Sequence, residues 1–147
     1  MTATTQHSAE LAARALYSAD RASQGLGMTL VEAGIGSARV TMVVRADMTN
    51  GQGICHGGFI FALADSAFAF ACNSHGDPTV AAGVTVDFVA PARLNDELTA
   101  VAREVWLSGR TGIYDMVVTG AGGAVIAHVR GRSHRLRRAT PDSATKD

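Results

Sequence analysis

The 147-residue sequence has few of the features that would assign it to a specialised class of protein. Its two cysteines are too few for the disulfide framework of a small secreted domain, so we expect reduced thiols and a cytoplasmic protein. Basic and acidic residues balance at 13 each, which gives no indication of nucleic acid as a partner. The amino-terminal segment has neither the basic nor the apolar region of a signal peptide. The longest apolar run, residues 59–72, is too short to cross a membrane and contains Asp65.

What remains is the composition of a globular protein. Hydrophobic residues make up 47% of the chain and charged residues 18%, a balance typical of a folded core rather than of disorder. A chain of this length is sufficient for one such core. We therefore expect a single domain over residues 1–147, with flexible tails at about 1–7 and 139–147.

The hydrophobic periodicity predicts an α+β protein. A helical pattern over residues 8–24 ends at glycines, and a second, apolar helix follows a loop rich in asparagine and glycine. The predicted strands cover 28–33, 38–45, 80–89, 98–107, 112–118 and 124–134, and the apolar helix covers 57–72. We expect the last four strands to form a meander, and the sheet to wrap around the apolar helix.

Asp65 is the one fully charged residue between His56 and Asp77, and it lies within the apolar helix. Burying a carboxylate costs free energy unless a partner compensates the charge, so the presence of an acid in this apolar helix requires an explanation. Gly57 and Gly58 open the same helix, where backbone amides have no intrahelical partner and lie at the positive end of the dipole. The Gly58 amide is therefore a candidate donor to an oxyanion. Alternatively, the glycines permit close packing, and Asp65 is a structural acid satisfied by nearby donors.

The spacing of Gly58 and Asp65 has a geometric consequence. Seven residues place them on nearly the same helix face but roughly 10.5 Å apart along the axis, at about 1.5 Å per residue. A carbonyl held at Gly58 is then too far from the Asp65 of its own helix. If the two residues act together, the site lies between two subunits related by a two-fold axis.

Residues near the helix offer further candidates. His56 could orient a carbonyl or the loop, or be a structural histidine, and Asn50-Gly51 is a turn signal whose side-chain amide could bind a carbonyl. Ser66 lacks a histidine or lysine placed to activate it, so we expect a packing role. The cysteines and histidines have no metal-ligand spacing, and we expect neither a metal nor an organic cofactor.

Basic residues are concentrated at the end of the chain. Five of the 13 lie within residues 130–138, and Arg110 lies in the turn SGRTG. These residues could form a solvated strand end, or they could anchor phosphates through the forked donors of arginine. For the second case the candidates are Arg110, Arg132 and Arg135.

Four segments of the sequence resemble one enzyme family. NGQGICHGGFIFALADSAFAFACNSHG is similar to the central-helix signature of hotdog-fold acyl-CoA thioesterases, in particular the phenylacetic acid degradation branch. The segments VTVDFVAPARLNDELTA, GRTGIYDMVV and RGRSHR resemble that branch as well, so that the likeness spans about residues 9–135. It implies a hotdog fold, a homodimer with shared active sites, and a tetramer of two such dimers.

The resemblance also implies roles for individual residues. Asp65 matches the catalytic carboxylate, acting as general base on water or as nucleophile, and the Gly58 amide of the partner subunit matches the group that polarises the thioester carbonyl. Asn50 and His56 match positions that shape the carbonyl and water site.

Two further positions are implied to contact substrate. Gly57 belongs to the matching glycine pair, and Thr85 is the nearest hydroxyl to the family's helper hydroxyl, where this sequence has AAG at 81–83.

The implied activity is hydrolysis of (hydroxy)phenylacetyl-CoA or a related thioester to the free acid and CoA. A broader thioesterase for medium or long fatty acyl-CoA, and a non-catalytic acyl-CoA binding protein, are the alternatives. The pattern of hydratases with this fold has a histidine five residues after the aspartate. This sequence has Phe70 at that position, so the second group of hydratase chemistry is missing.

Overall fold

The computed structural model describes residues 3–138, so that the expected tail at 139–147 and residues 1–2 lie outside the described part. Its helices are α1 (Gln6–Ala19), α2 (Arg21–Gly25) and α3 (Gly57–Cys72), with short 3-10 turns η1 (Ala46–Met48) and η2 (Ala121–Gly123). Its strands are β1 (Thr29–Gly34), β2 (Ser37–Val43), β3 (Thr79–Phe88), β4 (Glu97–Ser108), β5 (Thr111–Thr119) and β6 (Val125–Arg135). None of the helices in this part of the chain is both long enough and apolar enough to span a membrane.

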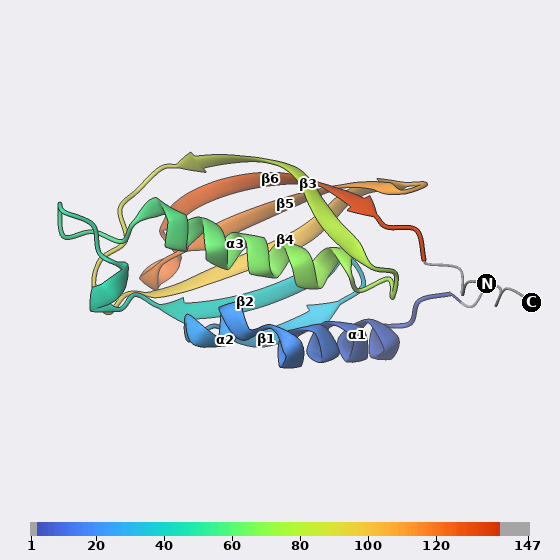
Figure 1. Cartoon of the computed structure of the whole chain (residues 1–147). Helices are drawn as coiled ribbons and strands as arrows, with labels where there is room; N and C mark the ends of the chain where they lie inside the picture. The colour runs from blue at the N-terminus through green and yellow to red at the C-terminus, as the bar shows by residue number, and fades with distance from the viewer. Residues whose placement is uncertain (1–2, 139–147) are drawn as a thin grey trace, which may run out of the picture.

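The six strands form one antiparallel sheet that curves around α3 (Figure 1). Their order is β1-β2-β4-β5-β6-β3, so β4, β5 and β6 form the expected meander but β3 does not belong to it. The expectation of a four-strand meander was wrong because β3 pairs with β6 at the far edge, while β4 pairs with β2. This order brings strands to both sides of α3. The architecture is the hotdog fold, which confirms the expected α+β class.

The amino-terminal helix differs from the expected single helix over 8–24. It begins earlier, at Gln6, where Thr5 and Ser8 form a reciprocal capping box, so part of the expected 1–7 tail is helical. It then breaks at Asp20, whose backbone leaves the helical conformation (φ −86°, ψ 89°). The Asp20 side chain accepts a hydrogen bond from the Ser23 amide at 2.9 Å and so caps α2. Aspartate is a preferred N-cap residue because its side chain binds an amide in the first turn of the following helix. Asp20 does so here and thereby starts a second helix, α2.

The core lies between α3 and the concave face of the sheet. The helix buries Leu63, Ala67 and Phe68, and alternate residues of the strands, such as Val40 and Met116, face it. Burial of this kind contributes roughly 25 cal/mol per Å² of apolar surface and is the main stabilising term. Close approach of helix and sheet depends on glycine: a Cβ at Gly131 of β6 would lie 2.5 Å from the Phe68 ring.

We expect Gly131→Ala to lower the free energy of unfolding by about 1–3 kcal/mol, because the added methyl overpacks the contact with Phe68. Gly25→Ala is the matched control, since a Cβ there meets none of the described residues within 4 Å and its backbone φ is not positive. Urea unfolding of the three proteins measures the difference. Equal midpoints for the two variants would contradict this account of the packing.

Candidate active site

The amino terminus of α3 is capped by His56. Its backbone is extended (φ −61°, ψ 133°), and its Nδ1 accepts a hydrogen bond from the Gly58 amide at 3.1 Å. An Nδ1 that accepts requires the proton of the neutral ring on Nε2, which leaves Nε2–H as a donor on the exposed side. The structure thus differs from the sequence expectation at Gly58, whose amide is already occupied by the cap.

Gly57 is the residue of this helix start whose amide remains available. Among the described residues, none accepts a hydrogen bond from it. Gly57 is half-buried and lines a cavity together with Asn50, Ile60 and Phe88. The Asn50 Oδ1 accepts from the amides of Gln52 and Ile54 within its own loop. The Nδ2 end of Asn50 is therefore the end left for a ligand.

Asp65 lies two turns further along α3, in a different cavity. This second cavity is mostly apolar and includes Leu16 of α1, Phe68 and Cys72 of α3, and Val80 of β3. Gly57 and Asn50 do not line it, and Asp65 does not line theirs. The single chain therefore keeps the two halves of the expected site apart, as the spacing along the helix requires.

The carboxyl of Asp65 has an unusual electrostatic environment. The residue is half-buried, and burial raises its pKa above the ordinary value. The negative charge of Asp20 raises it further. A carboxylate in apolar surroundings is a stronger base than one in water, because the protonated form is relatively favoured. Burial also raises the pKa of the neighbouring Cys72 thiol to about 12, so this cysteine is an inert part of the wall.

The remaining substrate-contact candidates lie elsewhere. Thr85 is exposed and pairs with Arg130 across β3 and β6, in hollows that do not include Asp65. Arg132 is exposed on β6, with its guanidinium beside Gly83. The structure does not bring Thr85 and Asp65 together within one chain.

Arg110 and Arg135 do lie next to each other. The Arg110 Nε donates to the Arg135 carbonyl at 3.1 Å, and its Nη2 lies 3.2 Å from the His134 Nε2. The Arg135 Nη1 lies 3.5 Å from Asp77 Oδ2, which partly neutralises it, and its buried Nε has no hydrogen-bond partner within residues 3–138. Arg110 is therefore the freer of the two charges for an anionic ligand.

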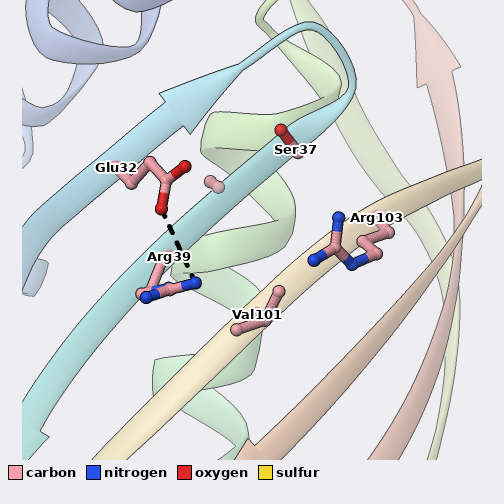
Figure 2. Close-up of a pocket in the computed structure, with 6 residues that line it drawn as sticks. Glu32, Ser37, Arg39, Val101 and Arg103 are labelled. Atoms are coloured by element: carbon pink, nitrogen blue, oxygen red, sulfur yellow. Dashed lines mark ion pairs between the residues drawn. The ribbon is translucent and has the colours of Figure 1, made fainter.

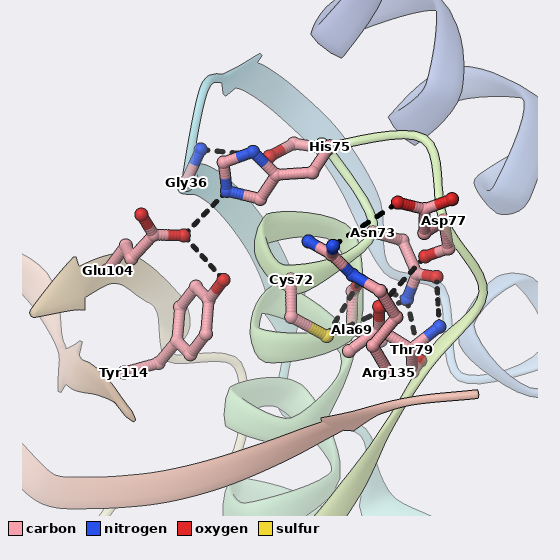
Figure 3. A network of polar contacts seen from close by, with 11 residues as sticks. Gly36, Ala69, Cys72, Asn73, His75, Asp77, Thr79, Glu104, Tyr114 and Arg135 are labelled. Atoms are coloured by element: carbon pink, nitrogen blue, oxygen red, sulfur yellow. Dashed lines mark hydrogen bonds and ion pairs between the residues drawn. The ribbon is translucent and has the colours of Figure 1, made fainter. Parts of the chain in front are cut away.

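A polar network fixes the carboxyl end of α3 (Figure 3). Glu104 Oε2 accepts from the Tyr114 hydroxyl and contacts His75 Nε2, both at 2.6 Å. Asn73 donates to the Thr79 carbonyl at 2.9 Å and accepts from the Thr79 amide at 3.0 Å. Sequence patterns did not indicate this network, because its members are separated by up to 41 positions. It holds β3 against the wall of the Asp65 cavity.

Another hollow, on the outer face of the sheet, is unrelated to these cavities (Figure 2). Its lining comes from β1, β2 and β4 and includes Arg39, Arg103 and Glu32. Arg39 and Glu32 form an exposed ion pair at 3.6 Å, which contributes little in water. No group of three potential metal ligands occurs in residues 3–138.

The chain is similar to known thioesterases in sequence and in fold. The Thioesterase superfamily model matches residues 52–127. The acyl-coenzyme A thioesterase PaaI of Escherichia coli is 42% identical over 130 residues, covering 88% of this chain and 93% of that protein. Human acyl-coenzyme A thioesterase 13 is 32% identical over 91% of this chain and 98% of the human protein.

A solved structure gives the same result. The Escherichia coli PaaI protein from the phenylacetic acid degradation operon superimposes with a TM-score of 0.89 at 41% identity, covering 90% of this chain and 96% of that one. The fold and the relatives are those of a thioester hydrolase. The chain belongs to the Thioesterase superfamily, which confirms the resemblance seen in the sequence.

We expect Asp65→Asn to stabilise the protein at neutral pH. The folded-state pKa of Asp65 is raised, so its contribution to stability is present below the unfolded pKa of about 3.9 and is lost as the pH rises through the folded value. Thermal unfolding should show a higher Tm for the variant at pH 7.5 and a difference that shrinks below about pH 4. A Tm difference that does not change with pH would contradict the assigned environment.

Proposed function

We propose that this protein hydrolyses acyl-CoA thioesters, with phenylacetyl-CoA or a hydroxylated phenylacetyl-CoA as substrate, in the breakdown of aryl-acetic acids. The observation that carries the proposal is the half-buried carboxylate of Asp65, which faces a mostly apolar cavity beside a helix that begins with an available glycine amide. Membership of the thioesterase family supports thioester chemistry. The Escherichia coli relative, from a phenylacetic acid degradation operon, supports an aryl-acetyl group.

The reaction that fits this arrangement uses water directly. The thioester carbonyl accepts a hydrogen bond from the Gly57 amide, with the Asn50 amide and the His56 Nε2–H nearby. Asp65 takes a proton from water as the water oxygen attacks the carbonyl carbon. The tetrahedral oxyanion is stabilised at the helix start, and it collapses by breaking the carbon–sulfur bond. The CoA thiolate then receives the proton, and the acid leaves.

We propose that two subunits share each site. Gly57 and Asp65 are eight residues apart, or roughly 12 Å along the axis at about 1.5 Å per residue, too far for one carbonyl to contact both. Strand β3 is an edge of the sheet; its Val80 end lines the Asp65 cavity and its Phe88 end lines the Gly57 cavity. Both side chains are about half exposed, at 45% and 53%.

Antiparallel pairing of two β3 edges satisfies the unpaired backbone groups of each edge. It also sets the Val80 end of one subunit against the Phe88 end of the other, and so brings Asp65 to the partner's Gly57. The homodimer follows from this pairing, and a tetramer of two dimers remains part of the proposal.

Other parts of the proposal concern the rest of the substrate and the setting. Arg110 and Arg132 are exposed cations suited to the CoA phosphates, with Arg135 held nearer Asp77. The reaction requires no metal or organic cofactor, because carboxylate, amide and water complete it. A cytoplasmic location is supported by two buried, free cysteines.

We expect Asp65→Ala to lower kcat by about 10²–10⁴-fold for phenylacetyl-CoA, because a positioned general base contributes that factor. Binding of the substrate should change little, since the side chain faces a cavity, and the variant should remain folded, since it loses a half-buried charge that burial disfavours. Release of CoA, followed with a thiol reagent, measures the rate, and calorimetry with a non-hydrolysable analogue measures affinity. Near-normal turnover of Asp65→Ala would rule out the mechanism.

A substrate panel separates the alternatives. We expect faster thiol release from hydroxyphenylacetyl-CoA and phenylacetyl-CoA than from benzoyl-CoA or palmitoyl-CoA. Preference for palmitoyl-CoA would favour the fatty acyl-CoA thioesterase, and binding without any thiol release would favour a non-catalytic binding protein.

The shared site predicts complementation between two inactive variants. Gly57→Pro removes the amide donor at the first helical position, where proline is tolerated, and His56 already has the extended conformation that precedes proline. Removing such a donor costs about 10²–10³-fold in kcat. Random mixing of Gly57→Pro with Asp65→Ala leaves half of the dimers mixed with one intact site each, or about a quarter of wild-type activity.

Gly58→Ala serves as a control, because it retains the amide that His56 binds. Absence of rescue after subunit exchange, verified by native mass spectrometry, would place both residues of each site in one chain and so contradict the sharing.

A further inference from the structure

Asp20, which separates α1 from α2, is joined by hydrogen bonds to the helix that carries Asp65. Ser23 Oγ donates to Asp20 Oδ2 at 2.5 Å, and the Ser23 and Ser66 hydroxyl oxygens are 2.7 Å apart. The single hydroxyl proton of Ser23 is used in the hydrogen bond that Ser23 donates to the Asp20 carboxylate. Ser66 is therefore the donor in the hydrogen bond between the two serines. The chain therefore runs from Ser66 through Ser23 to Asp20. Because it ends on a charge, each of its bonds is strengthened.

The Asp20 carboxylate is held in one place by these contacts. Its Oδ1 accepts from the Ser23 amide at 2.9 Å while its Oδ2 accepts from the Ser23 hydroxyl. The Asp20 amide donates to the Tyr17 carbonyl at 3.0 Å. Ser23 is only 2% exposed, so water has little access to the centre of the chain. A surface acid with free rotamers would have no such fixed position.

This fixed charge lies beside the base. Ser66 follows Asp65 on α3, and successive side chains of a helix project about 100° apart. Ser66 therefore faces α2, while Asp65 faces the cavity. Leu16, which precedes Asp20 by about one helical turn on α1, also lines this cavity. The two acids are close enough for the charge of Asp20 to raise the pKa of Asp65.

We infer that Asp20 is a positioning residue for the hydrolysis: the Ser66–Ser23 chain holds its charge at a set place beside Asp65 and so adjusts the strength of that base. The inference rests on the proposed role of Asp65 as the base. It adds α1 and α2, which the site as described so far does not use for chemistry, to the catalytic apparatus.

Few other ionisable groups face Asp65. On α3 the nearest is the Cys72 thiol, which is protonated because its pKa is about 12. The parts of β3 and the segment after β6 that line the cavity contribute Thr79, Val80, Ala81 and Leu136, none of which titrates. Glu104 of β4 raises the pKa of Cys72 and that of Tyr114 of β5, and neither Glu104 nor Tyr114 acts on Asp65. Within the described chain, Asp20 is thus the charge that acts on Asp65.

The test is the pH dependence of kcat/KM for phenylacetyl-CoA in wild type and Asp20→Asn. Asparagine retains the acceptor that caps α2 and removes the charge, so we expect the midpoint of the acidic limb to move to lower pH. A purely structural role for Asp20 would lower the plateau rate and leave the midpoint in place. An unchanged midpoint would overturn the inference. If Asp20→Asn does not fold, Asp20→Ser, which can also cap α2, replaces it.

Two controls isolate the charge. Glu10→Gln removes the same charge from α1 at a position about 15 Å from Asp20 along the helix axis. Glu10 is not one of the groups that raise the pKa of Asp65, so this variant should leave the midpoint unchanged. Ser66→Ala cuts the chain while keeping the acid and its contacts to Ser23, and should lower stability with a smaller change in midpoint. A shift in Glu10→Gln equal to that in Asp20→Asn would overturn the inference in favour of net charge.

A carboxyl ¹³C NMR titration of Asp65, assigned with Asp65→Asn, gives a readout that does not depend on turnover. A lower midpoint in Asp20→Asn on an active enzyme supports both conclusions. A lower midpoint on a protein that hydrolyses no thioester of the panel supports the coupling and rejects the proposed function. An active enzyme with an unshifted Asp65 rejects the coupling alone.

Discussion

The structure depends on one constraint, which is that α3 is apolar on almost every side and must be covered on every side. A helix of this kind is stable in water only within a protein core. The curved sheet covers most of it, and α1 and α2 cover part of the remainder. Strand order follows from the same need, because β3 at the far edge and β1 at the other allow the sheet to surround the helix. Where cover is incomplete, the half-buried Asp65 is found.

The half-buried carboxylate of Asp65 lowers the stability of the fold, and contacts elsewhere offset this loss. A partly desolvated carboxylate destabilises the fold, and the same desolvation makes it a better base. The network of Asn73, His75 and Glu104 at the end of α3 fixes the adjacent wall, so that the cavity around Asp65 keeps its shape. At the other end of the helix, the histidine cap occupies one amide and leaves its neighbour available. The start of α3 thus has one amide that stabilises the helix through its cap and one that is left unbonded within the described residues.

Local patterns in the sequence were enough to predict most of the elements, the buried helix and the place of Asp65 within it. Periodicity reports which residues are buried, and a lone charge in an apolar run is visible without a structure. Periodicity did not predict the strand order, because the pairing of β3 with β6 depends on how the sheet closes around α3. The hydrogen bond of the Gly58 amide was beyond sequence reasoning for a similar reason: whether the amide of Gly57 or of Gly58 is unbonded depends on the rotamer of His56.

The amino-terminal segment shows a different limit. The pattern from Asp20 to Ser23 contains a recognisable helix-start signal, yet a continuous helical stripe concealed it. The contact between Ser23 and Ser66 spans 43 positions and has no periodic signature. Side-chain contacts between distant segments of this kind decide how the site is held, and a single sequence does not reveal them.

The hairpin between β1 and β2 shows how unevenly the fold constrains its own variation. Gly36 adopts a positive φ of 63°, and a Cβ there would lie 2.7 Å from that of Glu104. Its amide binds Ser74 and its carbonyl binds the Glu104 amide, so both polar groups of the turn are used by other segments. The turn after β5 differs at Gly122, where a Cβ would meet no atom of residues 3–138 within 4 Å. Insertions and deletions should therefore be tolerated better in the second turn than in the first, to which two other segments, those of Ser74 and Glu104, are fitted.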